Sequence, residues 1–494
     1  MRIAIVHFHL QTGGVTRVIQ HACAALASVG HAVVVLSGEP PQQPGSLAAR
    51  VEVVSALGYE ERRQPLGASA LQQAMEQAAT RALGGPADLW HVHNHCLGKN
   101  LALPDALRGL AAAGQRLLLQ PHDFAEDGRP ALYRRMLETT DAQDGAALST
   151  HLYPLAPQIH YATLNERDYR FLAAAGIPST QLHRLPNAVS FASEQDSRAS
   201  RRPRDQHTRA RGDHRRWLYP TRAIRRKNLG ELLLWAALAG PEDRFATTQA
   251  PQNPLEQPIY QRWVALAQEL ALPVDLELGA DNSDFSALLA SSHALMTTSV
   301  AEGFGLAFLE PWLIGRPLAG RDLPEITADF RADGLDLSGL YQRLPVPLDW
   351  LDAATLRRRL DQALAAAASA YGREREVDDL ERAWHAAVAK DSRVDFGRLD
   401  EDGQIQVLRH IRTDPAAGSA LDATSPPLTA GAELIARNQA VVEREYLIDG
   451  YRRRLEAIYQ SLLNAPAAPL RDQADGPVLI ACFQAPERLH LLRT

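Results

Sequence analysis

The chain has 494 residues, of which 46% are hydrophobic and 22% are charged. This length and composition exclude a largely disordered chain and predict a folded protein of two or three domains. The formal net charge of −6 gives no overall attraction to nucleic acid or to anionic membranes, so we expect a small or neutral substrate.

Cysteine content and hydropathy indicate the compartment. Cys23, Cys96 and Cys482 lie far apart without C-x-x-C spacing, which argues against a disulfide framework and a structural zinc site. The first apolar run, at residues 3–6, is too short for the core of a signal peptide. No apolar run approaches the roughly 18 residues that a membrane helix needs. We therefore expect a cytoplasmic protein without a transmembrane segment.

The N-terminal part alternates short apolar runs with stretches of helical periodicity. This alternation is typical of βαβ units and of a doubly wound parallel sheet. We expect a first Rossmann-like domain over residues 1–190. Its expected strands are 3–6, 32–36, 88–92 and 117–120, and its expected helices are 15–26, 70–83 and 101–113.

A polar, arginine-rich segment separates this part from a second alternating series. Residues 191–216 predict a linker or exposed loop, with arginines from position 198 onward. A second Rossmann-like domain is predicted over residues 217–345, which makes the fold class α/β. Its expected strands are 217–220, 245–248, 274–278 and 294–298, and its expected helices are 229–239, 259–270, 285–290 and 306–314.

The last part of the chain is mostly helical in pattern. Helical periodicity is clearest at residues 351–371 and 433–463. We expect residues 346–494 to form a helical extension that covers both domains. Residues 477–483 are predicted as either one more strand or a tail.

The densest motif is the segment AEGFGLAFLEP at residues 301–311, where an expected strand ends and a helix begins. Gly303 and Gly305 allow backbone amides to approach a ligand closely, and a following helix N-terminus favours negative charge or hydroxyl groups. On a continuous helix, Glu310 would lie about 12 Å along the axis from Glu302. The two carboxylates are therefore predicted to hold opposite ends of one nucleotide sugar, Glu302 at the sugar and Glu310 at the ribose.

This segment resembles the E-x7-E signature of the retaining glycosyltransferases of family 4 and their GT-B relatives. The resemblance extends over residues 1–326. It implies two Rossmann-like domains that face a cleft, with the acceptor on the side of the first and the nucleotide sugar in the second. It also implies that Gly303, Phe304, Gly305, Leu306 and Glu310 bind the donor.

Other segments resemble motifs of the same family in the expected order. Arg222 and Lys227 resemble an R-x4-K motif whose cations neutralise the donor diphosphate, and cations at a helix N-terminus oppose its dipole and so need a reason to be there. His122 follows an expected strand and resembles the histidine that contacts the donor sugar near the reacting carbon. The remaining donor-binding residues implied are Gly13 and Gly14 in the first glycine-rich loop and Asn187 in a P-N-A-V segment, where Ala188 replaces the usual glycine.

The resemblance implies a retaining, metal-independent hexosyltransferase without a cofactor. Arg222 and Lys227 would meet the charge of the leaving diphosphate, which would take the proton of the acceptor in a front-face reaction. We expect a small soluble acceptor. If this acceptor is anionic, the arginine-rich residues 198–216 would be suited to bind it. A lipid acceptor and an oligomeric state stay open.

Three alternatives remain at this point. A nucleotide-sugar 2-epimerase shares the fold and needs water in place of an acceptor, and a non-catalytic GT-B protein would only bind its ligand. A metal site at His91, His93 and His95 is a further possibility because alternating side chains share a strand face. The D-x-D sequence at Asp400 lies in the helical tail, which does not favour a metal-held diphosphate.

Overall fold

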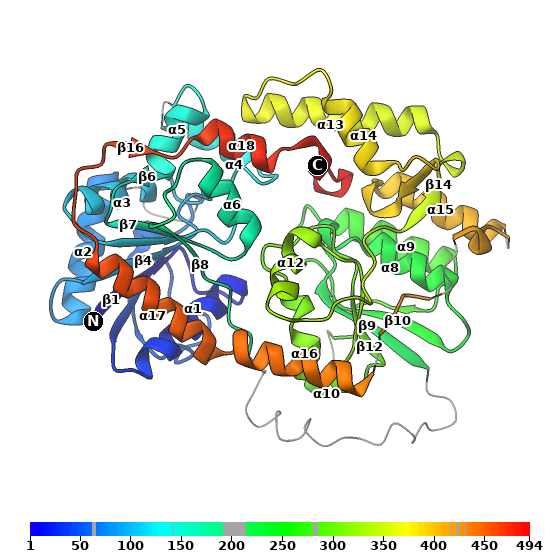
Figure 1. Ribbon diagram of the computed structural model, residues 1–494, viewed down its shortest axis with the longest axis horizontal. Coiled ribbons are helices and arrows are strands. Elements are labelled where there is room, and N and C mark those ends of the chain that lie inside the picture. Colours follow the sequence, from blue (N-terminus) through cyan, green and yellow to red (C-terminus); the bar gives the residue numbers. More distant parts are fainter. Residues whose placement is uncertain are drawn as a thin grey trace. The chain divides into compact units, whose positions relative to one another are not determined.

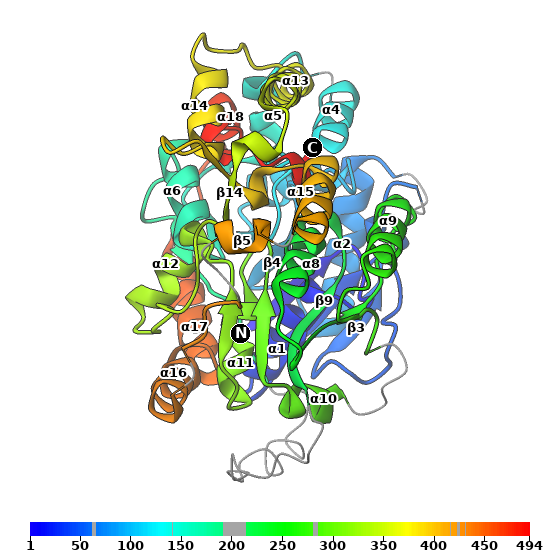
Figure 2. The ribbon, with the colours of Figure 1, turned by 90° about the vertical axis from the view of Figure 1, so that its right-hand side faces the viewer.

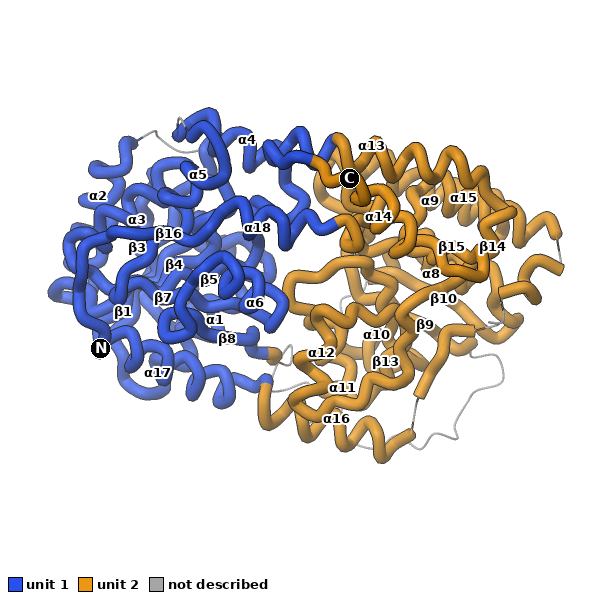
Figure 3. Tube along the Cα trace, turned by 45° about the horizontal axis from the view of Figure 1, so that its top comes forward, with its two compact units in different colours: residues 1–188, 366–374, 446–485 blue, residues 189–365, 375–445, 486–494 orange. Residues whose placement is uncertain are grey.

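The computed structural model describes residues 1–61, 66–140, 142–190, 214–279, 285–414, 416–421, 425–429 and 431–494. The chain forms two compact units, coloured blue and orange in Figure 3. Unit 1 comprises Met1–Ala188, Ala366–Glu374 and Tyr446–Ala485, and unit 2 comprises Val189–Ala365, Arg375–Glu445 and Pro486–Thr494. Residues 346–494 are therefore divided between the two units. Most of the predicted linker, residues 191–213, lies outside the described residues.

A parallel sheet forms the centre of unit 1, with strand order β3-β2-β1-β4-β5-β7-β8. The strands at β1, β2, β4 and β5 confirm the prediction. The other three were not predicted because they are short or carry polar side chains at alternate positions, as His160 does in β7. The strands are β1 (Arg2–His7), β2 (Ala32–Ser37), β3 (Arg50–Val53), β4 (Leu89–His93), β5 (Leu117–Gln120), β7 (Ile159–Thr163) and β8 (Leu182–Arg184).

Helices from both ends of the sequence cover this sheet. Helix α17 packs along α1, and Tyr451, Leu455 and Tyr459 of α17 share a core with Ile19 and Cys23 of α1 (Figure 1). The helices of unit 1 are α1 (Gly14–Ala27), α2 (Ala68–Leu83), α3 (Leu103–Ala112), α4 (Pro130–Thr139), α5 (Gly145–Leu152), α6 (Glu166–Ala174), α17 (Ile448–Asn464) and α18 (Gly476–Phe483).

Helix α18 corrects the strand or tail predicted for residues 477–483. The Asp475 side chain accepts a hydrogen bond from the backbone N–H of Val478, and Pro477 occupies the first turn. Both features start a helix, since the carboxylate satisfies a free N–H and proline is pre-set for the first turn. The prediction relied on the apolar run and did not take these two N-terminal signals into account.

The Tyr451 hydroxyl is fully buried and has no hydrogen-bond partner among the described residues. A buried polar group without a partner costs about 1–3 kcal/mol. We expect Tyr451→Phe to stabilise the protein by about 1 kcal/mol, measured as a rise in melting temperature. Tyr459→Phe is the matched control, because it removes a hydroxyl that lies 2.8 Å from His91 Nδ1 and so lowers stability. A fall in melting temperature for Tyr451→Phe would contradict the expectation.

Unit 2 contains a second parallel sheet with strand order β11-β10-β9-β12-β13. Its strands are β9 (Arg215–Arg222), β10 (Asp243–Gln249), β11 (Val274–Asp275), β12 (Ala294–Thr297) and β13 (Leu318–Gly320). Two short antiparallel pairs also occur among the described residues, β14 (Pro345–Pro347) with β15 (Arg393–Asp395) in unit 2 and β6 (Pro154–Leu155) with β16 (Asp472–Gln473) in unit 1.

Helix α8 is apolar on nearly all sides and is buried between the sheet and helices α9 and α15 (Figure 2). The predicted helix 306–314 is wrong in its extent: Leu306–Phe308 forms a 3-10 turn, and α11 begins only at Glu310. The helices of unit 2 are α8 (Leu229–Leu238), α9 (Gln257–Glu269), α10 (Phe285–Ser291), α11 (Glu310–Leu313), α12 (Pro324–Ala332), α14 (Asp379–Ala387), α15 (Glu401–Thr413) and α16 (Ala432–Glu445), with α13 (Ala353–Tyr371) running from unit 2 into unit 1.

A buried ion network fixes helix α8 to the end of the sheet in unit 2. The Arg321 guanidinium donates to both carboxylate oxygens of Glu231 and to both oxygens of Asp395, at 2.6–3.1 Å. The Tyr341 hydroxyl adds a hydrogen bond to Glu231 at 2.7 Å. Both carboxylates therefore contact the one guanidinium, which offsets part of the cost of burying them. Within the described part of the chain, no helix has both the length and the apolar content to cross a membrane.

Candidate functional site

The topology of unit 2 marks one edge of its sheet as a ligand-binding place. The chain runs from β9 to β10 and β11 on one side, then returns to β12 on the other side of β9. In open α/β sheets, ligands bind at the carboxyl ends of the strands where the order reverses in this way. Lys227 follows β9 and Glu302 follows β12, so neighbouring strands bring these two predicted residues together.

Lys227, Glu302 and Arg226 form one cluster at this edge. Lys227 Nζ donates a hydrogen bond to Glu302 Oε1. Arg226 Nη1 donates to Glu302 Oε2 at 3.0 Å and to the backbone oxygen of Ala301 at 2.7 Å. The side chains of Glu302 and Lys227 are only 9% and 16% exposed, whereas that of Arg226 is 41% exposed. The sequence had not singled out Arg226, although it stands directly beside Lys227.

Hydroxyl groups after β12 hold the loop that carries the two cations. Thr298 Oγ1 donates to the backbone oxygens of Lys227 and Asn228, each at 3.0 Å. Ser299 Oγ donates to the backbone oxygen of Arg226 at 3.2 Å. Asn228 adopts a left-handed conformation with φ of 53°, and its amide donates to Glu231 at 2.8 Å. Asparagine tolerates this backbone conformation better than most residues, so the turn is fixed from both sides.

The electrostatics of the cluster keep Glu302 ionised. Burial alone raises the pKa of Glu302, but Lys227 and Arg226 outweigh it and lower that pKa to about 2. Burial and, more weakly, Arg226 lower the pKa of Lys227 below its usual value, although Glu302 and Glu310 act in the opposite direction. Two cations thus face one carboxylate in a poorly hydrated position. Such a cluster suits an incoming anion, because Lys227 can turn from Glu302 to a phosphate oxygen.

The segment after Glu302 contains the other residues of unit 2 that are predicted to bind the donor substrate. Gly305 has a φ of 93°, and a Cβ there would lie 2.8 Å from the Phe308 ring, so the turn requires glycine. Phe304 is buried, and its ring packs edge to face against that of Phe330. Leu306 and Gly303 are half-buried. Because no continuous helix joins Glu302 to Glu310, the spacing expected from helical rise does not apply.

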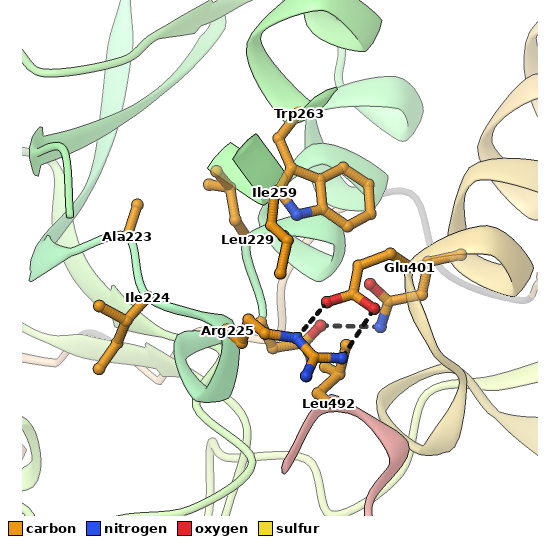
Figure 4. A pocket seen from close by; sticks show the side chains of 10 residues that line it. Ala223, Ile224, Arg225, Leu229, Ile259, Trp263, Glu401 and Leu492 are labelled. Atoms are coloured by element: carbon orange, nitrogen blue, oxygen red, sulfur yellow. Dashed lines mark hydrogen bonds and ion pairs between the residues drawn. The ribbon is translucent and has the colours of Figure 1, made fainter. Parts of the chain in front are cut away.

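The remaining arginines of the R-x4-K segment have different surroundings. Arg222 is exposed at the end of β9, and its Nε donates to Gln249 at 3.2 Å. Arg225 instead forms a two-point ion pair with Glu401, at 2.6 and 3.0 Å, beside a small pocket lined by Leu229 and Trp263 (Figure 4). Arg225 therefore anchors the loop, while Arg226 and Lys227 meet Glu302.

A second group of predicted site residues lies in unit 1, where β1 and β4 flank the reversal of strand order. His122 follows β5, and its Nε2 lies 2.8 Å from His93 Nδ1 at the end of β4. The backbone N–H groups of His122 and Asp123 donate to Asn94 Oδ1 at 2.7 and 3.1 Å. Burial lowers the pKa of His122 to about 3, so this imidazole is neutral at physiological pH.

The three alternating histidines do not converge on a common position. His91 contacts Tyr459 and Gln120, His93 contacts His122, and His95 Nε2 lies 2.9 Å from the backbone oxygen of Leu152. The shared strand face suggested by alternation therefore gives no shared set of ligand atoms.

The predicted glycines of unit 1 lie at the start of α1. Gly13 and Gly14 are exposed; a Cβ on Gly14 would meet nothing within 4 Å, and one on Gly13 only Gln11 oxygen at 3.9 Å. Packing thus does not require glycine at either position, which is consistent with close approach of a ligand. Asn187 is buried, and its Oδ1 has no hydrogen-bond partner in the part of the chain that the structure describes.

Glu126, on the loop after His122, gives a pH-dependent prediction. It is buried, and the Tyr153 hydroxyl lies 3.2 and 3.1 Å from its carboxylate oxygens. Burial raises its pKa to about 7, so the stability linked to its proton is complete below about pH 4.5 and lost as the pH rises through about 7. We expect Glu126→Gln to stabilise the protein by on the order of 1–3 kcal/mol at pH 8 and much less at pH 5.

Melting temperatures at pH 5 and pH 8 check this expectation for Glu126. Glu138→Gln is the control, because it makes the same substitution at an exposed position of the same unit. An equal effect of Glu126→Gln at both pH values would contradict the expectation.

Comparisons with known proteins extend these observations. Residues 12–193 match the family model described as Glycosyltransferase Family 4. The mannosylglucosyl-3-phosphoglycerate synthase of Petrotoga mobilis is 29% identical over 254 residues, which are 49% of this chain and 48% of the relative. The match thus spans about half the length of this curated relative.

Solved structures show the fold. Anabaena Alr3699/HepE in complex with UDP and glucose aligns with a TM-score of 0.52 at 13% identity, over 93% of this chain and 99% of that chain. A glycosyltransferase from Rickettsia africae aligns with a TM-score of 0.53 at 11% identity, over 94% and 98%. The expected α/β fold with two Rossmann-like domains, of the GT-B type, is confirmed.

Proposed function

We propose that this chain, a GT-B protein whose residues 12–193 match glycosyltransferase family 4, moves a hexosyl group from a nucleoside-diphosphate sugar to a small soluble acceptor. The observation that carries the proposal is the cluster of Lys227, Arg226 and Glu302 at the reversal of strand order in unit 2. The family match in unit 1 and the UDP and glucose bound by the Anabaena protein support a nucleotide sugar as donor.

In the proposed reaction, the bond between the sugar C1 and the diphosphate oxygen breaks as a bond to the acceptor oxygen forms. Lys227 and Arg222 bind the diphosphate and stabilise the charge that develops on it. The leaving phosphate oxygen takes the proton of the acceptor hydroxyl on the same face of the sugar, which retains the anomeric configuration. Fixed side-chain cations supply this neutralisation, so we propose that no metal ion is required.

Glu302 and Glu310 hold the donor in this scheme. Glu302 accepts hydrogen bonds from the sugar hydroxyls once Lys227 turns to the diphosphate, and Arg226 keeps the Glu302 carboxylate in place. Glu310 accepts from the ribose hydroxyls. In unit 1, we propose that His122 binds the donor sugar and that Gly13, Gly14 and Asn187 also take part in donor binding.

An anionic acceptor is the substrate class that we favour. The name of the Petrotoga relative gives a product that contains phosphoglycerate, an anionic group. This similarity covers half of each chain, so it suggests a class of acceptor and not a particular compound.

The test is product formation from UDP-, GDP- and ADP-sugars in the presence of EDTA. The acceptor panel contains 3-phosphoglycerate, glucosyl-3-phosphoglycerate and uncharged sugars, and each donor is also incubated alone. We expect acceptor-dependent release of nucleoside diphosphate and a product whose anomeric configuration, measured by NMR, matches the donor. Inversion would contradict the mechanism, turnover with water alone would indicate an epimerase, and binding without turnover would indicate a non-catalytic protein.

A further inference from the structure

The His93 imidazole is the side chain that holds the His122 ring. Nδ1 of His93 lies 2.8 Å from Nε2 of His122, and the two rings meet edge to edge, with centroids 5.1 Å apart and planes inclined by 29°. His93 is fully buried, whereas His122 keeps 7% of its surface exposed. A hydrogen bond between two neutral imidazoles contains a single proton, so it fixes which nitrogen of each ring is protonated.

The surroundings of His93 Nε2 decide which ring donates. This nitrogen is buried and has no hydrogen-bond partner in the described part of the chain. If His122 were the donor, His93 would carry its own proton on Nε2, where a buried N–H would lack an acceptor. As for backbone groups, a buried donor without an acceptor is tolerated less well than an acceptor without a donor. The arrangement therefore favours His93 as the donor, through Nδ1.

The neighbouring His91 ring has a partner at each of its nitrogens. His91 Nε2 lies 2.9 Å from Gln120 Oε1, and His91 Nδ1 lies 2.8 Å from the Tyr459 hydroxyl. The His91 ring contacts the His93 ring, with centroids 4.4 Å apart. Burial lowers the pKa of His91 to about 4 and that of His122 to about 3, so these rings stay neutral.

We propose that His93 is a positioning residue that donates its Nδ1–H to Nε2 of His122 and so leaves His122 protonated on Nδ1. The nitrogen of His122 that His93 does not use is the one available to a ligand. His122 would then present an N–H donor to a hydroxyl oxygen of the sugar. This last step rests on the proposed function, whereas the protonation of the two rings does not.

Nitrogen NMR of the full chain labelled with [15N]histidine tests the proposal without any turnover. We expect His122 to show a protonated Nδ1 and an unprotonated Nε2 at pH 7.5, with its signals assigned through His122→Asn. His93→Asn keeps an amide N–H near the place of Nδ1 and is expected to preserve this state. His93→Leu removes the hydrogen-bond donor, so the protonation of His122 is expected to be no longer fixed on Nδ1. Protonation of His122 on Nε2 in the unaltered protein would overturn the proposal.

Kinetics then separate positioning from general stability. We expect His93→Leu to lower kcat about tenfold, and His93→Asn to restore it to within about threefold of the unaltered protein. In a His122→Ala background, His93→Leu is expected to have no further effect on kcat. Equal losses in both backgrounds would overturn the proposal. If no nucleotide sugar supports turnover, the proposed function fails, and the NMR result still decides the protonation of His122.

Discussion

Replacing Lys227 with alanine is expected to lower kcat by about 10²–10³-fold, the usual cost of removing one preorganised group that stabilises charge in the transition state. Lys227 is the one cation of the cluster whose ammonium reaches Glu302 from a largely buried position. Without it, the developing charge on the diphosphate would be met by the more exposed arginines alone. Initial rates at saturating donor and acceptor measure this effect.

The fold is expected to survive Lys227→Ala, because Arg226 still pairs with Glu302. Lys390→Ala is the matched control, since Lys390 is an exposed lysine of the same unit. Circular dichroism and melting temperature verify that both variants are folded. A Lys227→Ala enzyme with a kcat close to that of Lys390→Ala would contradict the role given to this side chain.

Replacing Arg321 with leucine is expected to destabilise unit 2 by about 3–5 kcal/mol, the usual cost of breaking a buried ion pair. The change leaves Glu231 and Asp395 buried without their cation. Burial raises the pKa of Asp395, but Arg321 outweighs it and lowers that pKa to about 2. The carboxylates accept protons more readily once the arginine is gone, so the loss is expected to be larger at pH 7 than at pH 4.

Urea unfolding followed by tryptophan fluorescence measures this loss, because every tryptophan except Trp90 lies in unit 2. Arg409→Ala serves as the control: its ion pair with Glu269 is exposed, and such pairs contribute little to stability. If Arg321→Leu shifted the midpoint no more than Arg409→Ala, the network would not be the stabilising feature described.

Sequence patterns were sufficient to predict a strand where that strand is buried and apolar, as at β1, β4 and β12. They failed where short strands carry polar side chains, as at β8, and where local capping outweighs an apolar run, as at α18. The assignment of residues 446–464 to unit 1 also escaped prediction, because it depends on the fit of Tyr451 and Tyr459 against α1 and the sheet. Such long-range packing leaves no local pattern.

In the candidate site, too, local motifs could be predicted from the sequence and contacts that depend on the fold could not. Motif spacing found Lys227 and Glu302, and the order of parallel strands explains why they meet. Arg226 and the Thr298 hydroxyl were missed because their roles come from the geometry of one turn. The helical spacing assumed for Glu310 was wrong because the left-handed Gly305 and the 3-10 turn interrupt the helix.

Donor binding measured by isothermal titration calorimetry in EDTA tests the proposed site most directly. The unaltered protein, Lys227→Ala, Glu310→Ala and the control Lys390→Ala are each titrated with UDP-, GDP- and ADP-sugars. We predict that one nucleotide sugar binds the unaltered protein and the Lys390→Ala control equally well, and that affinity falls at least about tenfold in the other two variants. Binding of equal strength in all four proteins, or binding to none of them, would contradict a nucleotide-sugar site built on Lys227 and Glu310.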